Sequence, residues 1–127
     1  MISVNVKNGT AQGVETIKQI VDAGLRVYAR GAAYTVVKDN TGQYLIVCSN
    51  NGYTVGLHGM TGTAYEHVMN ADAFSVFETC AALVYNGVWL AAAKDVAALW
   101  PHVLKHCGHM TLANFTARGY SIDTFNV

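Results

Sequence analysis

The sequence predicts an α+β fold, a single domain in which an antiparallel β meander carries an N-terminal helix and C-terminal helices packed on the sheet. The meander is indicated by three strand-like runs, Tyr34–Lys38, Gln43–Cys48 and Tyr53–Leu57, joined by the turn sequences DNTG and SNNG. Asn and Gly in such turns tolerate the positive φ angles that tight hairpins require. The chain has 127 residues, half of them apolar, so we expect residues 1–127 to form one domain around one core.

A strand, a helix and a further strand are predicted before the meander. Alternating apolar residues indicate a strand over Met1–Val6. Thr10 is placed to cap a helix whose apolar stripe has helical spacing and consists of Val14, Ile17, Ile20 and Val21. Gly24 is expected to end this helix, because glycine favours the left-handed backbone of that position. Alternation over Leu25–Arg30 then predicts a strand that leads into the meander.

The second half is predicted to begin with strands and a hairpin. Thr63–Met69 and Ala73–Glu78 have strand character. The segment AALVYNGVWLAA places Asn86 and Gly87 between two apolar runs, which is a strong hairpin signal. Both arms are apolar on both faces, so the hairpin is expected inside the protein or against another subunit.

Helices and a last strand complete the prediction. Asp95 can cap a helix that runs through Cys107, and Pro101, which lacks an amide hydrogen, should kink or split that helix near Trp100. Gly108 is expected to end it. The final elements are a short helix from Thr111 to Arg118 and, after Gly119, a strand over Tyr120–Phe125.

The charge balance bears on the possible partners. Eight Lys and Arg match eight Asp and Glu, and they are scattered singly along the chain. No basic stripe is present to neutralise phosphates, so nucleic acid is disfavoured as a partner. Low net charge combined with many apolar residues favours a homo-oligomer over a lone monomer.

The cysteines and the N-terminus favour a cytoplasmic location. Cys48, Cys80 and Cys107 lie far apart, and MISVNVKNG has neither the basic start nor the apolar stretch of a signal peptide. The longest uncharged stretch, Thr79–Ala93, is shorter than the roughly 20 residues that span a bilayer. We therefore expect reduced thiols and no membrane partner.

Histidines near the C-terminus form a candidate metal cluster. His102 and His106 stand one helical turn apart, and Cys107 or His109 could supply a third zinc ligand. The spacing matches no complete zinc motif. A solvated helix end, where imidazoles meet the negative end of the helix dipole, is the favoured interpretation. No metal and no cofactor are therefore expected.

The predicted binding surface lies in the first half of the chain. Gly-rich bends surround His58, Tyr65 and Glu66, and glycines there would let a backbone approach a ligand or would serve the turns alone. Glu66 with His58 could form an acid and base pair. Arg26 and Arg30, expected to share one strand face with Tyr28, could bind an anion or form ordinary surface ion pairs with Asp22, Asp39 and Glu66. The residues assigned to binding are Arg26, Arg30, Tyr53, His58, Tyr65 and Glu66.

No catalytic residue can be assigned, because the sequence has no P-loop, GxGxxG or GxSxG motif. The run ETIKQIVDAGLRVYARGAAYTVVKDNTGQYLIVCSNNGYTVGLHG resembles small accessory proteins encoded by bacteriophages, which share a helix, a glycine and strands ending in GQYLI and NGYxxGL patterns. The resemblance covers about the first half of the chain, and it implies a phage origin.

Three functions are compatible with that origin, and the third of them is a small structural component of the virion. The first is a binding protein that inhibits a host protein or a bacterial defence complex and acts as a homo-oligomer in the host cytoplasm. The alternative is an oligomeric enzyme that degrades a host metabolite such as S-adenosylmethionine at a subunit interface, with Glu66 and either Tyr65 or His58 in the chemistry.

Overall fold

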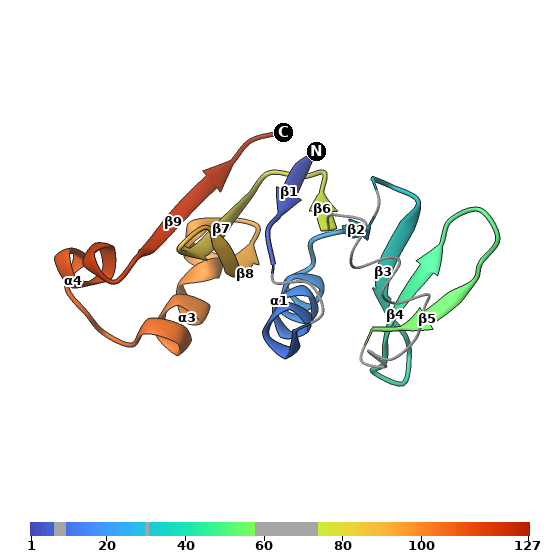
Figure 1. The fold of residues 1–127 in the computed structure, drawn as a ribbon, viewed down its shortest axis with the longest axis horizontal. Coiled ribbons are helices and arrows are strands. Elements are labelled where there is room, and N and C mark those ends of the chain that lie inside the picture. The colour runs from blue at the N-terminus through green and yellow to red at the C-terminus, as the bar shows by residue number, and fades with distance from the viewer. Residues whose placement is uncertain (7–9, 30, 58–73) are drawn as a thin grey trace.

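The fold consists of helices packed against two antiparallel sheets (Figure 1). The structure is a computed structural model that describes residues 1–6, 10–29, 31–57 and 74–127. The helices are α1 (Ala11–Asp22), α3 (Val96–Cys107) and α4 (Leu112–Ala117). The strands are β1 (Ile2–Val4), β2 (Val27–Ala29), β3 (Tyr34–Lys38), β4 (Tyr44–Cys48), β5 (Thr54–Gly56), β6 (Phe74–Val76), β7 (Cys80–Tyr85), β8 (Val88–Ala93) and β9 (Tyr120–Phe125).

The strands divide between a six-stranded and a three-stranded sheet within the described ranges. The larger sheet has the order β1-β6-β2-β3-β4-β5, and the smaller has the order β8-β7-β9. The predicted meander is confirmed as β2 to β5, and β3 has the predicted bounds. One feature of the strand order was not predicted from the sequence: β6 lies between β1 and β2 and pairs with both. The predicted strand Thr63–Met69 lies outside the described residues.

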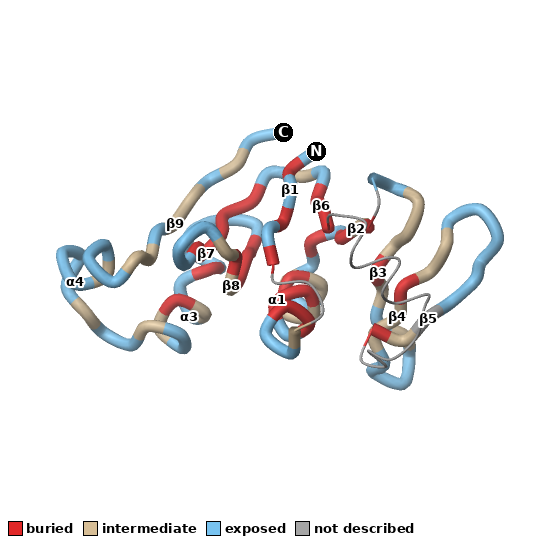
Figure 2. The backbone as a smooth tube through the Cα atoms, in the orientation of Figure 1, coloured by how far each residue is buried: buried red, intermediate tan, exposed pale blue. Residues whose placement is uncertain are grey.

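Helix α1 begins and ends where its sequence signals place it. The hydroxyl of Thr10 accepts a hydrogen bond from the amide of Gly13 (3.1 Å), and Gly24 follows the helix with φ +86°. Val14, Ile17 and Ile20 of the predicted stripe are buried. The helix contacts β2 and β3 of the larger sheet and β8 of the smaller one, so it joins the two sheets. Figure 2 shows buried residues along α1 and the strands around it.

Both apolar faces of the β7–β8 hairpin are packed against other parts of the protein. Its turn residues Asn86 and Gly87 have φ of 48° and 83°, as a two-residue hairpin requires. Ala82 and Trp89 pack in the main core with α1 and the larger sheet. Leu83 faces the other way, into a smaller core with residues of α3. Of the two predicted locations, the interior of the protein is therefore the one observed for this hairpin.

The edge of β8 that does not pair with β7 forms hydrogen bonds with residues of the N-terminal part. The side-chain amide of Gln19 donates to the carbonyl of Ala92 (2.9 Å), and the Ala92 amide donates to Gln19 Oε1 (2.9 Å). The Trp89 amide donates to the carbonyl of Asn5 (2.7 Å). The hydroxyl of Thr16 lies 3.3 Å from the Trp89 carbonyl oxygen. These groups occupy edge positions that a further strand would otherwise fill.

The C-terminal helices follow their predicted caps, with one correction. Asp95 accepts from the Ala98 amide (2.7 Å), and Gly108 ends α3 with φ +65°. A kink or a split was predicted near Trp100, and of these the split is wrong, because α3 continues through Pro101 from Val96 to Cys107. Proline removes one backbone hydrogen bond, and the buried neighbours Leu99 and Val103 hold both sides of that turn against the small sheet. Helix α4 and strand β9 form where they were predicted.

Candidate functional site

Two of the six predicted binding residues lie in the described part of the structure. Arg30, His58, Tyr65 and Glu66 fall outside the described residues, as does the proposed Glu66 and His58 pair. Arg26 is exposed and precedes β2; its amide donates to Glu78 Oε1 (2.6 Å), and its Nε lies 3.7 Å from the same oxygen. Among the described carboxylates its partner is thus Glu78 rather than Asp22 or Asp39, and an ion pair at such an exposed site contributes little stability.

Arg26 and Tyr53 do not share one edge or one end of the sheet. Arg26 precedes β2, Tyr53 precedes β5, and β3 and β4 lie between these strands. The strand registers align Ala29 with Tyr34 and Tyr34 with Cys48, whose amide donates to the carbonyl of Tyr53. The two residues are therefore separated by about 14 Å across the sheet and about 10 Å along it. The structure does not join them into one binding face.

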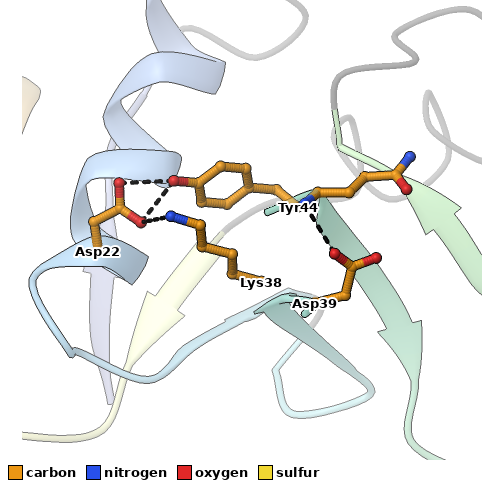
Figure 3. Close-up of polar contacts among 5 residues, drawn as sticks. Asp22, Lys38, Asp39 and Tyr44 are labelled. Atoms are coloured by element: carbon orange, nitrogen blue, oxygen red, sulfur yellow. Dashed lines mark hydrogen bonds and ion pairs between the residues drawn. The ribbon is translucent and has the colours of Figure 1, made fainter. Parts of the chain in front are cut away.

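A polar cluster fastens the end of α1 to the β3–β4 hairpin (Figure 3). The hydroxyl of Tyr44 lies 2.6 and 2.7 Å from the two carboxylate oxygens of Asp22, and Lys38 Nζ lies 3.5 Å from Asp22 Oδ1. The hydrogen bond to Asp22 raises the pKa of Tyr44, and the contact with Tyr44 and the charge of Asp22 raise the pKa of Lys38. With both pKa values raised, Tyr44 and Lys38 each keep their proton. We therefore call Asp22, Lys38 and Tyr44 a clasp, because they connect α1 to the hairpin and have a structural role.

The turn beside this clasp is organised by Asp39. Its Oδ1 accepts hydrogen bonds from the Thr41 amide (2.9 Å), the Thr41 hydroxyl (2.6 Å) and the Gln43 amide (2.9 Å). The hydrogen bonds from Thr41 and Gln43 lower the pKa of Asp39, because they stabilise the charged carboxylate. All three partners belong to the turn itself, so this carboxylate serves the hairpin.

The histidine segment of α3 contains a fixed hydrogen bond but no assembled metal site. His102 Nε2 lies 3.2 Å from Gln19 Nε2. Because the Ala92 backbone orients the Gln19 amide, Nε2 of Gln19 is the donor and Nε2 of His102 is the acceptor in this contact. Burial lowers the pKa of His106, with Lys105 and His102 adding to the effect. Within the part of the chain that the structure describes, no group of three His, Cys, Asp or Glu could hold a metal ion.

An apolar pocket lies farther along the same half of the chain. Its cavity volume is about 210 Å³, and α3, α4, β9 and the link between the two helices form its walls. The lining residues are Trp100, Val103, Leu104, Gly108, His109, Met110, Leu112, Phe115 and Ile122. Trp100 and Leu112 are also 49% and 79% exposed to solvent. We refer to this site as the apolar pocket.

Aromatic contacts hold one wall of the apolar pocket. Phe115 stacks on Tyr120 with ring centroids 5.5 Å apart, and Tyr120 contacts Tyr85 at 4.8 Å. Cys107 lies beside Tyr120, and burial raises the pKa of its thiol. This site was not predicted from the sequence, although Trp100 within α3 and Leu112 at the start of α4 are large apolar residues that could have indicated it.

No protein-family model, curated protein or solved structure that we compared with the chain matches it. Among the described helices, none is both long and apolar enough to cross a membrane.

Proposed function

We propose that the chain is a binding protein that docks on a partner protein through the apolar pocket. The observation that supports this proposal is the concave apolar surface with Trp100 and Leu112 exposed at it. Exposed apolar residues that gather around a cavity are typical of protein-binding sites, and a tryptophan at the centre often contributes much of the binding free energy.

The volume of the apolar pocket favours one side chain as its occupant. Pockets for small molecules and cofactors usually measure about 300–1,000 Å³ and contain several placed polar groups. This pocket is smaller, at about 210 Å³, and its one ionisable lining residue is His109. An apolar or aromatic anchor from a partner protein fits such a site better than a nucleotide-like metabolite.

The partner class follows from the resemblance of the first half of the chain to phage accessory proteins. On that basis, the partner is a host protein or a defence complex in the cytoplasm of an infected cell, and the protein inhibits it. Balanced charges indicate that recognition depends on shape and apolar contact rather than on steering by charge. The enzyme alternative depends on His58, Tyr65 and Glu66, and no described residue adds an observation in its favour.

The proposal is tested by comparing variants of the apolar pocket with a matched surface variant. Tagged protein is expressed in bacteria, and the captured partner is identified, purified and titrated against each variant. Trp100→Ala and Leu112→Ser should weaken binding at least tenfold, because a central apolar anchor loses its contacts. Val96→Ser is the control, since Val96 is 41% exposed on the same helix and does not line the pocket.

Unchanged affinity in both pocket variants would refute the proposal. Loss of binding only on changing Arg26 or Tyr53 would instead place the binding surface on the larger sheet. Circular dichroism spectra of each variant must match that of the unmodified protein before its affinity is compared.

A further inference from the structure

The outer edge of β9 is open, in contrast to the closed edge of β8. Strand β9 has six residues, pairs with β7 on one side, and runs along the margin of the molecule (Figure 1). Within the described ranges, no hydrogen bond reaches its outer side. Proteins usually protect such an edge with Lys, Pro, a bulge or a covering segment, and here Asp123 is the single charge on the strand.

The backbone groups that face outward can be assigned from the hairpin turn. The Asn86 amide donates to the Gly119 carbonyl (3.0 Å), so Gly119 directs its carbonyl toward the β7 side. Backbone direction alternates along an antiparallel strand. The residues that point away from β7 are therefore Tyr120, Ile122 and Thr124, and together they offer three amides and three carbonyls.

We infer that this edge pairs with β9 of a second copy of the chain, antiparallel and centred on Ile122. In that register Ile122 lies opposite the partner's Ile122, and Tyr120 lies opposite the partner's Thr124. Each of these pairs joins outward-facing residues, so the three amides and three carbonyls of each copy all find partners. The two small sheets become one continuous sheet with the order β8-β7-β9-β9-β7-β8.

The side chains are compatible with this register. Ser121 lies opposite the partner's Asp123, so the two carboxylates do not meet. A register slipped by two residues, centred on Asp123, would place Asp123 against its own copy and leave the outward groups of Tyr120 opposite Asn126, beyond the end of the strand. The balanced charges of the chain add no long-range repulsion between copies. A second copy fits this edge because its own β9 is a strand of equal length whose single charge, Asp123, faces Ser121 rather than another carboxylate.

The dimer is expected to be of moderate affinity. A short strand edge buries less surface than a standard interface, so we expect a dissociation constant of about 1–100 µM. The twofold axis is perpendicular to the sheet, so the α3 and α4 layers of both copies lie on the same face. This inference does not depend on the function proposed for the apolar pocket.

Sedimentation of the full chain over this concentration range tests the inference. The average mass should rise from that of one chain to that of two. Thr124→Pro should raise the dissociation constant at least tenfold, because proline removes an outward amide while the pairing with β7 remains. Thr124→Val is the matched control, since it keeps the amide and should dimerise like the unmodified chain. A chain that stays monomeric up to several hundred micromolar, a range chosen to exceed roughly the weakest expected constant, overturns the inference.

A cysteine pair tests the register even if the proline variant fails to fold. Both cysteine variants are made in a protein that also carries Cys107→Ser, because Cys107 of α3 contacts Tyr120, which lies on β9 near the new cysteines. Ile122→Cys should form a disulfide between copies, since its Cα would lie about 5.5 Å from that of its symmetry mate, a separation that disulfides span. Thr124→Cys should not, because its mate would lie more than about 10 Å away along the strands. Crosslinking of the second variant but not the first refutes the register, and a dimer that Thr124→Pro leaves unchanged refutes the β9 interface.

Discussion

Replacing Gln19 by Met should destabilise the protein by about 2–4 kcal/mol. The side chain of Gln19 both donates to and accepts from the backbone of Ala92, with both distances 2.9 Å. Methionine has a similar length and helix propensity but makes neither hydrogen bond. A net hydrogen bond is worth roughly 0.5–1.5 kcal/mol, and an unpaired buried backbone group costs about 1–3 kcal/mol. Loss at two groups therefore costs about 1–3 kcal/mol if water replaces the Gln19 amide and about 2–6 kcal/mol if it does not, and the expected value lies between these two cases.

Urea unfolding followed by circular dichroism provides the measurement. With a slope of roughly 2 kcal/mol per molar, the middle of the usual range, the expected loss shifts the midpoint by about 1–2 M at constant slope. Gln12→Met is the matched control, because Gln12 is exposed on the same helix and its amide reaches only the Thr16 hydroxyl at 3.2 Å. The control should change stability by no more than about 0.5 kcal/mol.

The reasoning would be refuted if Gln19→Met and Gln12→Met unfolded at the same urea concentration. That result would mean that water replaces the Gln19 amide at the edge of β8 without loss of stability. A decreased slope for Gln19→Met would instead indicate that the two sheets no longer unfold together.

Three further outcomes follow from the structure. The pKa of Tyr44 is raised in the folded state, so its hydrogen bond to Asp22 stabilises the fold fully below pH about 10, and this stabilisation is lost as the pH rises through the raised pKa. Asp22→Asn should therefore shift the ultraviolet titration of Tyr44 to lower pH. An unchanged titration would contradict the hydrogen bond between Tyr44 and Asp22. Val84→Lys and Trp89→Glu should each unfold the chain rather than yield a folded monomer, since both side chains are buried within one copy; a folded, monomeric variant by circular dichroism and sedimentation would be the opposite result. Treatment with a chelator should leave the melting temperature unchanged, and stoichiometric bound zinc that is lost from a His102→Ala variant would show that the helix-end interpretation is wrong.

Local signals predicted much of the secondary structure. Thr10 and Asp95 cap their helices as expected, and Gly24 and Gly108 follow their ends with positive φ. Each of these features depends on residues within one or two turns, so the sequence alone contains the necessary information. The same holds for the hairpin at Asn86.

The partners of the strands were not predictable in the same way. Nothing in the residues of β6 indicates that it inserts between β1 and β2, because strand pairing depends on the whole sheet. The apolar pocket likewise exists only where Trp100, Leu112 and Ile122 meet from three elements. The binding residues were predicted from glycines and charged residues in the first half, and such local features do not indicate where side chains of separate elements meet.

The position of β6 determines the order in which the chain can fold. Residues 2–4 pair with residues 74–76, and Gln19 bonds to a residue 73 positions farther along. During synthesis at roughly 5–20 residues per second, α1 waits about 4–15 s for its contacts with β8, whereas β3, β4 and β5 can pair as soon as they emerge. The early hairpins are therefore joined for several seconds to a helix that lacks its contacts with β8, and during this interval a chaperone or a second nascent chain has access to that side of α1.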